Sequence, residues 1–267
     1  MPFEIIDPNK NQVPILVSVP HCGTEIPDSI RDQYDPEMIA AIDDTDWFVD
    51  QLYDFVGDLG IKMIRAKYSR WVIDLNRNAE SKPLYNDGRV ITALCPTTNF
   101  NDRNIYLDDG PTQEEINKRI SSYYYPYYDQ IRLELTKLQK QFKHVLFFDA
   151  HSIRQHVPGI RAEKFPDLIL GDADEQAADS KIIQTAMDVL SSTSYSFKHN
   201  HPFKGGNLTR TFGQPEKDIH ALQLEMAKTV YMDDNETQYD DSRAEVVRKD
   251  LKHLFESLIQ TLNQMNQ

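Results

Sequence analysis

The sequence predicts an α/β fold in which helices flank a central, mixed but largely parallel sheet. Two apolar runs, 13–19 and 145–150, are short and end in polar residues, as buried strands do. Helical patterns separate the strand candidates, and the longest of them covers residues 113–142. This alternation is typical of a sheet covered on both faces. No internal repeat, low-complexity linker or break in composition divides the chain, so we expect a single domain over residues 1–267.

The composition excludes several classes of partner. The formal net charge is −13 and no basic block offsets it, which argues against a nucleic-acid or anionic-membrane partner. No apolar run approaches the roughly 20 residues of a membrane span. The first residues lack the features of a secretory signal, and Cys22 and Cys95 are too few for a disulfide scaffold. We therefore expect a cytoplasmic protein, in which a local group of arginines can still bind a small anionic substrate.

The first strong strand candidate is 13–19. A proline follows it, and a glycine stands two residues after His21, so we expect a sharp turn that exposes the imidazole. Residues 47–56 carry apolar side chains at helical spacing. Either Asp44 or Asp46 could cap that helix, and both would then precede its apolar face.

Two shorter strand candidates come next, at 61–66 and 71–75. The second leads directly into Asn76 and Arg77. Residues 78–112 are rich in Asn, Asp, Pro and Gly and show little periodicity. Connections of this length inside compact domains are usually functional, so this loop is a candidate to close over a substrate.

The second half of the chain continues the alternation. The helical pattern 113–142 is interrupted near Pro126, and strand 145–150 then leads into His151. The remaining elements are expected as strand 166–171, helix 177–191, strand 221–224 and the amphipathic helix 242–262. We interpret the last helix as scaffold.

Three side chains with catalytic chemistry stand at the ends of apolar strands: His21, His151 and Glu225. Ligands of such sheets collect at the carboxyl ends of the strands. Two imidazoles and a carboxylate are the ligand set of many catalytic zinc sites. The spacing is dispersed, however, and no local zinc motif supports it. Taken alone, Asp149 and His151 could equally cap their strand.

Arginines and one lysine stand in similar positions. Arg70, Asn76 and Arg77 surround a predicted strand end, and Arg binds carboxylates through two parallel hydrogen bonds. The other cations in turn-like contexts are Arg154, Lys204 and Arg210. Any single arginine more often pairs with a surface acid, but together these cations favour a small dicarboxylate as the ligand.

Several short motifs carry a resemblance to a known family. They are Ser18-Val19-Pro20-His21-x-Gly23, Asp44-Thr45-Asp46-Trp47, Tyr68-Ser69-Arg70, Asp74-Leu75-Asn76-Arg77, Asp149-Ala150-His151-Ser152-Ile153-Arg154, Phe203-Lys204-Gly205-Gly206 and Gln223-Leu224-Glu225. In this order they resemble the N-formylglutamate amidohydrolase (deformylase) family. The string from Asp74 to Arg77 also resembles the aspartoacylase group of the zinc-carboxypeptidase superfamily. The resemblance implies an α/β fold of that type and one Zn²⁺ ion.

The resemblance also implies a set of metal ligands. His21 and His151 match the family's zinc-binding histidines. In the zinc carboxypeptidases a glutamate three residues after the first histidine completes the site, but Thr24 stands there in this chain. We therefore expect the third ligand from the segment that precedes helix 47–56. Asp46 is favoured because it opens that helix. The alternatives are Asp44 and Glu25.

The other roles implied by the resemblance concern catalysis and substrate binding. Glu225 corresponds to the superfamily's general base, and Arg70 would polarise the scissile carbonyl. Asn76 and Arg77 would bind the α-carboxylate of the substrate. The candidates for its side-chain carboxylate are Arg154, Lys204 and Arg210, which the sequence does not rank. Asp74 and Asp149 are the candidates for orienting a ligand histidine.

The implied function is zinc-dependent hydrolysis of N-formyl-L-glutamate to formate and L-glutamate, a step of histidine degradation. Residues 158–164, Asp172 and residues 199–202 depart from the pattern expected in this family. Hydrolysis of another N-acyl amino acid or short peptide at the same metal site therefore stays open. A third hypothesis is a non-catalytic protein that binds acidic metabolites, which would have no need of Glu225 beside two histidines.

Overall fold

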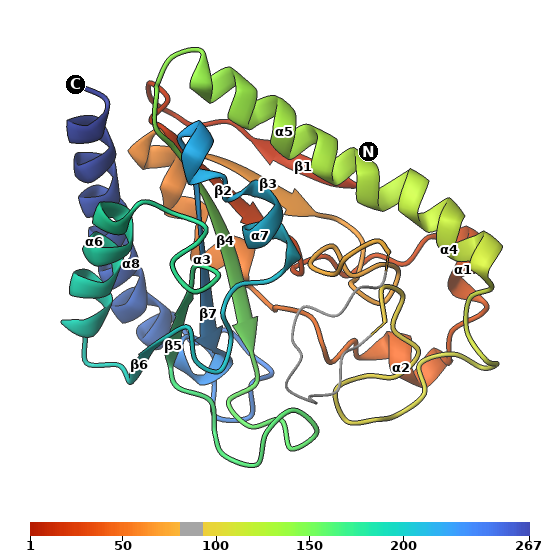
Figure 1. Cartoon of the computed structure of the whole chain (residues 1–267). Coiled ribbons are helices and arrows are strands. Elements are labelled where there is room, and N and C mark those ends of the chain that lie inside the picture. Colours follow the sequence, from red (N-terminus) through yellow and green to blue (C-terminus); the bar gives the residue numbers. More distant parts are fainter. Residues whose placement is uncertain (81–92) are drawn as a thin grey trace.

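The computed structural model of the chain describes residues 1–80 and 93–267 (Figure 1). Among these residues, seven strands form one sheet in the order β1-β3-β2-β4-β7-β5-β6. The strands are β1 (Phe3–Ile6), β2 (Ile15–Val19), β3 (Lys62–Ala66), β4 (Val145–Ile153), β5 (Leu168–Gly171), β6 (Phe197–His199) and β7 (Ile219–Ala227). The α-helices are α1 (Asp28–Arg31), α2 (Pro36–Ala40), α3 (Val49–Leu52), α4 (Gln113–Arg119), α5 (Tyr125–Gln139), α6 (Ser180–Ser191), α7 (Asn207–Phe212) and α8 (Asp241–Met265).

The centre of the sheet is parallel and its edges are mixed, as predicted. β4 pairs in parallel with β2 on one side and with β7 on the other. β1 and β5 run antiparallel to their neighbours β3 and β7. All nine residues of β4 are buried, which agrees with its almost continuous apolar sequence. Because the parallel strands end at one edge, the polar residues that follow them are brought together there.

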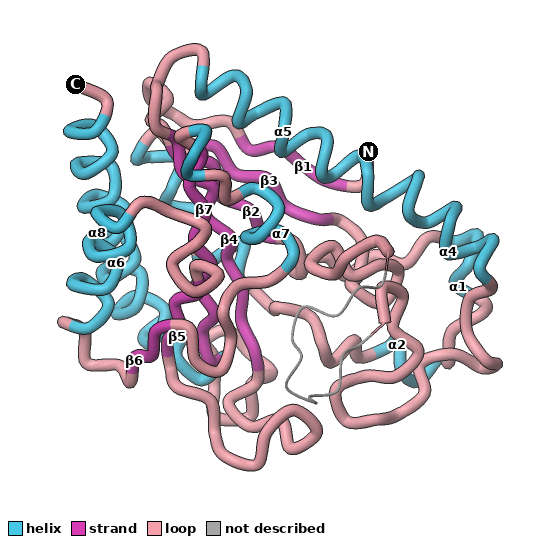
Figure 2. Tube along the Cα trace, in the orientation of Figure 1, coloured by secondary structure: helices cyan, strands magenta, loops and turns pink. Residues whose placement is uncertain are grey.

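Helices cover both faces of the sheet. α6 and α8 lie side by side on one face, and their apolar side chains join those of β2, β4 and β7 in the largest core cluster (Figure 1). α5 and α7 cover the other face and pack on β4. In Figure 2 the loops that follow β4 lie at the lower end of the sheet, and the loop that connects α5 to β4 lies at the upper end. No helix among the described residues is long and apolar enough to cross a membrane.

The prediction of a strand at 71–75 was wrong. This segment is a series of turns, and the carbonyl groups of Trp71, Val72 and Leu75 accept from side chains and not from a neighbouring strand. Tyr34 Oη donates to the Trp71 carbonyl at 3.1 Å, and the buried guanidinium of Arg119 donates to the Val72 carbonyl at 3.2 Å. The segment is therefore apolar because it is buried, not because it belongs to the sheet.

Two helix predictions also need correction. The helix expected over 47–56 begins only at Val49, because Phe48 adopts a left-handed conformation (φ 63°). Asp46 therefore does not open the helix. The interruption expected near Pro126 is a change of helix type and not a break, since a π-helical turn, Ile120–Tyr124, joins α4 to α5 just before this proline. The predicted loop 78–112 falls partly on residues 81–92, which lie outside the described residues.

Candidate metal centre and active site

His21, Asp46 and His151 form a buried cluster at the carboxyl edge of the sheet. Each offers one ligand atom, and these atoms all lie within 4.8 Å of one another. Asp46 Oδ2 is 3.2 Å from Nδ1 of His151 and 3.8 Å from Nδ1 of His21. The two imidazole rings are tilted, with centroids 4.9 Å apart. The structure thus brings together the three residues that were predicted to bind a metal.

The backbone explains why Asp46 reaches this position without opening a helix. Its amide N–H donates to the His21 carbonyl at 3.0 Å, so the two candidate ligands are joined directly. The amide N–H of Ser152, next to His151 in β4, donates to Asp46 Oδ2 at 3.1 Å. Asp46 is therefore held by the end of β4 and by the turn that follows β2.

The far nitrogen of each histidine binds a buried carboxylate. His21 Nε2 lies 2.8 Å from Asp74 Oδ1, and His151 Nε2 lies 2.9 Å from Asp149 Oδ2. In the neutral form that binds a metal, each Nε2 carries the proton, because a carboxylate only accepts, and the lone pair of each Nδ1 then points toward Asp46. Two lone pairs and a carboxylate at this separation repel one another unless a cation lies between them. The donor set therefore fits a metal ion, with Asp74 and Asp149 in the orienting role.

The electrostatics of the cluster agree with this reading. Burial and the positive charge of Arg70 lower the pKa of His21, which favours the neutral form that binds metals. Burial also acts to lower the pKa of His151, but the carboxylate of Asp149 and the hydrogen bonds to Asp149 and Asp46 outweigh it and hold that pKa well above its ordinary value. The surroundings of His151 thus favour a positive charge at this position, either as a proton on Nδ1 or as a bound cation.

The alternative third ligands have other partners. Asp44 Oδ2 accepts from the indole N–H of Trp71 at 2.9 Å, and its Oδ1 accepts from the Phe100 amide at 3.1 Å. Glu25 has an exposed side chain that lies 3.6 Å from the Lys67 ammonium group. Neither belongs to the cluster, so the geometry favours Asp46.

Arg70 and Arg77 share a carboxylate with the metal cluster. Arg70 NH2 donates to Asp74 Oδ2 at 2.6 Å, and Arg77 Nε lies 3.9 Å from the same oxygen. Arg70 is buried, stands over the ring of Phe100 and reaches within 3.9 Å of Asp46 Oδ1. Although burial opposes it, the charges of Arg70 and His21 hold the pKa of Asp74 well below its usual range. This part of the site is therefore positively charged beside the cluster.

Glu225 lies on the strand next to His151 and at the same level of the sheet. The two residues are Cα partners in the parallel β4–β7 pair, so their side chains extend from the same face. Burial raises the pKa of Glu225 to about 8. A carboxyl group with a pKa near neutrality can both accept and return a proton, which is what a general base and acid must do.

Gln223 belongs to one of the motifs quoted from the sequence, but the sequence reasoning assigned it no role. Its Oε1 accepts from the Gly206 amide at 2.8 Å, and the Asn76 amide nitrogen lies 3.4 Å away. Asn76 Nδ2 is also 3.1 Å from His151 Nε2, but that nitrogen already carries a proton for Asp149, so Gln223 is the better acceptor. The signal was available, since Gln223 stands two residues before Glu225 and shares its face of the strand.

The other predicted cations have partners outside the cluster of His21, Asp46 and His151. Arg154 donates through Nε to Asp43 at 2.9 Å and through NH1 to Glu236 at 3.1 Å. Lys204 pairs with Asp174 at 2.9 Å, and Arg210 Nε donates to the Gly205 carbonyl at 3.1 Å. Lys204 and Arg210 belong to the segment that touches Gln223, whereas Arg154 ties together loops beyond the end of β4.

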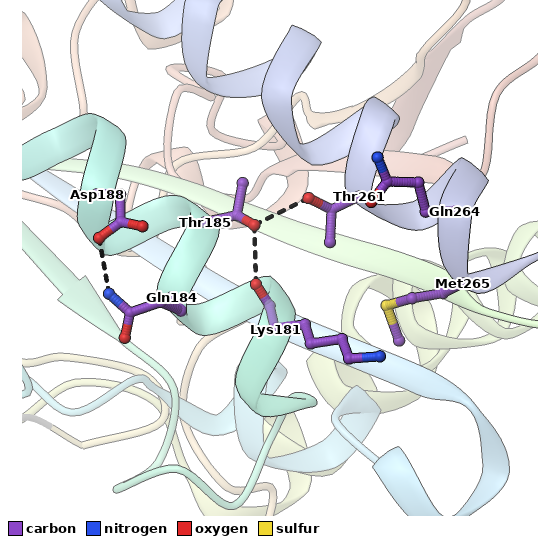
Figure 3. Close-up of a pocket in the computed structure, with 7 residues that line it drawn as sticks. All are labelled: Lys181, Gln184, Thr185, Asp188, Thr261, Gln264 and Met265. Atoms are coloured by element: carbon purple, nitrogen blue, oxygen red, sulfur yellow. Dashed lines mark hydrogen bonds between the residues drawn. The ribbon is translucent and has the colours of Figure 1, made fainter.

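A separate pocket of about 410 Å³ lies between α6 and α8, on the other face of the sheet (Figure 3). It is lined by Lys181, Gln184, Thr185, Asp188, Thr261, Gln264 and Met265. The hydroxyls of Thr185 and Thr261 meet at 2.8 Å between the two helices. No predicted site residue lines this pocket, so it is distinct from the candidate active site.

Comparison with known proteins points to one family. A family model described as N-formylglutamate amidohydrolase matches residues 13–232. The chain is 38% identical over 259 residues to the N-formylglutamate deformylase of Pseudomonas putida, with 96% of each chain covered. The enzyme of the same name from Pseudomonas aeruginosa gives the same identity and coverage.

Two solved structures share the fold. The N-formylglutamate amidohydrolase from Ralstonia eutropha JMP134 has a TM-score of 0.84 at 22% identity, and the match covers 98% of this chain and 99% of that one. A gene product of Agrobacterium tumefaciens has a TM-score of 0.77 at 14% identity, covering 99% of this chain and 96% of the other.

Proposed function

Because the chain belongs to the N-formylglutamate amidohydrolase family, we propose that it hydrolyses the formyl amide of N-formyl-L-glutamate to formate and L-glutamate. The observation that carries this proposal is the buried cluster of His21, Asp46 and His151 beside Glu225. A protein that only binds acidic metabolites would have no use for a metal site next to a general base.

We assign one Zn²⁺ to the cluster, since two imidazoles and a carboxylate leave a fourth position open in a tetrahedral site. When bound, zinc supplies a Lewis acid that polarises a carbonyl group and lowers the pKa of water. His21, Asp46 and His151 would hold it. Asp74 and Asp149 keep the two rings in the required tautomer through their hydrogen bonds to Nε2.

In the proposed reaction, Glu225 transfers the proton and Arg70 stabilises the developing charge. Glu225 accepts a proton from the attacking water as the new C–O bond forms at the formyl carbon. Arg70 stabilises the negative charge that develops on the formyl oxygen, which a buried guanidinium does effectively. Glu225 returns the proton to the nitrogen of glutamate as the C–N bond breaks. Its raised pKa suits both transfers.

The two carboxylates of the substrate require cations close to the cluster of His21, Asp46 and His151. We assign the α-carboxylate to Arg77 and to the Asn76 amide, whose second N–H is available once Gln223 has accepted the first. We assign the side-chain carboxylate to Lys204 and Arg210, because the segment that carries them contacts Gln223 through the Gly206 amide, whereas Arg154 joins Asp43 and Glu236 beyond the end of β4. We also place the enzyme in the cytoplasm, because both cysteines are unpaired.

A second candidate is hydrolysis of a different N-acyl amino acid at the same centre. Two departures from the family pattern contact each other, since Asp172 pairs with His199 and with Asn200, each at 2.7 Å. The next residue, Ala173, donates its N–H to the Lys204 carbonyl at 2.6 Å. Asp172 and its two partners therefore shape the turn that carries Lys204, and this turn could alter which substrate side chain is accepted.

One assay tests both candidates. Metal content is measured on the purified protein, and formate release is measured with N-formyl-L-glutamate, N-formyl-L-aspartate and N-formyl-L-glutamine, while glutamate release is measured with N-acetyl-L-glutamate. We expect about one zinc per chain and the highest kcat/KM on N-formyl-L-glutamate. A higher kcat/KM on another substrate would favour the second candidate. A metal-free protein whose activity survives chelators would exclude both.

A further inference from the structure

Two stacked tyrosines hold the backbone on both sides of Asn76. The rings of Tyr124 and Tyr128 are 4.2 Å apart and nearly parallel, at 16°. Tyr124 Oη donates to the Arg77 carbonyl at 2.9 Å, and Tyr128 Oη donates to the Leu75 carbonyl at 2.8 Å. Both tyrosines are buried, so neither hydroxyl exchanges this bond for one to bulk water. The turn that carries Asn76 is thus fixed from the side of α5.

Asn207 determines the direction of both hydroxyls. Its Nδ2 lies 3.0 Å from Tyr124 Oη and 2.8 Å from Tyr128 Oη. The amide has two N–H groups, and each donates to one hydroxyl, which keeps its own hydrogen for a backbone carbonyl. The opposite orientation of the amide would take the hydroxyl hydrogens and leave the carbonyls of Leu75 and Arg77 without these donors. Asn207 therefore sets the pattern of the whole clamp, by which we mean Tyr124, Tyr128 and Asn207.

The beginning of α7 closes on Asn76 from the other side. The Leu208 amide donates to Asn76 Oδ1 at 2.9 Å, and the Asn207 amide donates to the Asn76 carbonyl at 3.4 Å. Gly206 packs so closely that a Cβ atom there would overlap the Asn76 side chain. The turn at Asn76 is therefore held by α5 on one side and by α7 on the other, two helices that are far apart in the sequence.

This turn carries a cation toward the candidate active site. Arg77 Nε lies 3.9 Å from Asp74 Oδ2, the oxygen that also binds Arg70. A cation on a flexible turn loses backbone freedom as well as side-chain freedom when it binds a carboxylate, whereas a cation on a fixed turn loses only the side-chain part. The π-helical turn that ends at Tyr124 is the kind of distortion often found at functional sites.

We propose that Tyr124, Tyr128 and Asn207 are positioning residues that aim Arg77 and the Asn76 amide at the carboxylate next to the substrate's amide nitrogen. This inference rests on the proposed function. It assigns recognition of the α-carboxylate to a clamp that does not itself touch the substrate. Loss of one clamp hydroxyl should weaken binding of substrates that have this carboxylate and leave the chemical step unchanged.

The test uses the zinc-loaded enzyme and the variants Tyr124→Phe and Tyr128→Phe, with Tyr125→Phe as control. Tyr125 is the neighbouring tyrosine and its side chain is 51% exposed. Two substrates are compared, N-formyl-L-glutamate and N-formyl-4-aminobutanoate, which lacks only the α-carboxylate. We expect both clamp variants to raise KM for N-formyl-L-glutamate by about fivefold to tenfold, with kcat within about twofold of the wild type. Their kcat/KM for N-formyl-4-aminobutanoate should equal that of the wild type.

An equal loss on both substrates, or an unchanged KM, would overturn the inference while leaving the proposed function standing. If the wild type releases no formate, the proposed function fails, and calorimetric titration with L-glutamate then decides the inference. Weaker binding to Tyr124→Phe than to Tyr125→Phe would support the clamp. Equal affinity, or no binding by any of the proteins, would refute it.

Discussion

His21 Nε2 lies 2.8 Å from Asp74 Oδ1, while the other oxygen of the same carboxylate binds Arg70 at 2.6 Å. One buried carboxylate therefore orients a candidate metal ligand and also holds Arg70, the residue that we propose for the oxyanion. The candidate metal centre and the proposed oxyanion site are coupled through this single side chain.

Replacing Asp74 should accordingly affect both parts. We expect Asp74→Asn to weaken zinc binding by about 10- to 100-fold, because the Nε2 proton of His21 loses its ionised acceptor. Turnover at saturating zinc should also fall, since Arg70 loses its partner. A chelator-competition titration and kcat measured on the zinc-loaded protein would check these effects. The exposed residue Asp28 provides the control Asp28→Asn, and equal zinc affinity in the two variants would contradict the prediction.

Glu225→Gln should separate metal binding from catalysis. The amide keeps the size of the side chain but cannot accept the proton of the attacking water, so kcat should fall by about 10²- to 10⁴-fold. Zinc content should stay near one per chain, because Glu225 is not among the three clustered ligands. Glu216→Gln, at an exposed position before β7, should leave both quantities unchanged. Substantial activity in Glu225→Gln would remove this residue from the role of general base.

His151→Ala should abolish metal binding and turnover together. The substitution removes one of the three ligand atoms and leaves Asp149 and Asp46 facing each other without a cation. Elemental analysis of the purified variant should find almost no zinc, and formate release should drop accordingly. His156→Ala, an exposed histidine five residues later, should keep both. Full zinc occupancy in His151→Ala would mean that the metal binds elsewhere.

A different histidine should make folding stability depend on pH. His220 is buried, and its Nδ1 accepts from the Asp179 amide at 3.2 Å, so the proton is on Nε2. Burial lowers the pKa of His220 from 6.5 to about 4. Between these two pKa values the unfolded chain binds a proton at this histidine that the folded chain does not bind. The contribution of His220 to the free energy of unfolding therefore has its full value above pH 6.5 and decreases as the pH falls toward 4.

The loss can be measured by urea unfolding at pH 7 and pH 5. We expect the free energy of unfolding of the wild type to fall by about 2 kcal/mol more than that of His220→Gln over this interval. The exposed His253 supplies the control His253→Gln, which should follow the wild type. The same pH dependence in all three proteins would show that His220 does not titrate in this range.

The sequence predicted the centre of the fold better than its edges. The long apolar run that became β4 admits hardly any reading except a buried strand. β1 and β6 have only four and three residues and lie at the edges of the sheet, where little hydrophobic pattern is needed. Segment 71–75 was misread because burial alone makes a segment apolar, and only the positions of Tyr34 and Arg119 reveal that its carbonyls bind side chains.

The sequence also predicted some residues of the candidate site better than others. The histidines and Glu225 could be selected because each stands at the end of a recognisable strand. Asp46 was selected for a helix position that it does not occupy, and its actual place depends on amides of the backbone at His21 and Ser152. The roles of Gln223 and Asn207 depend on contacts between segments far apart in the sequence, which no local pattern encodes.

The pairing of His151 with Glu225 across β4 and β7 has an evolutionary consequence. Their separation is set by the hydrogen-bonded spacing of two adjacent parallel strands, which is about 4.8 Å in any sheet. Loops beyond the strand ends, such as residues 158–164, can therefore change without displacing the proposed base Glu225 from the candidate ligand His151. New substrate preferences could arise in such a lineage while the reaction itself is inherited intact.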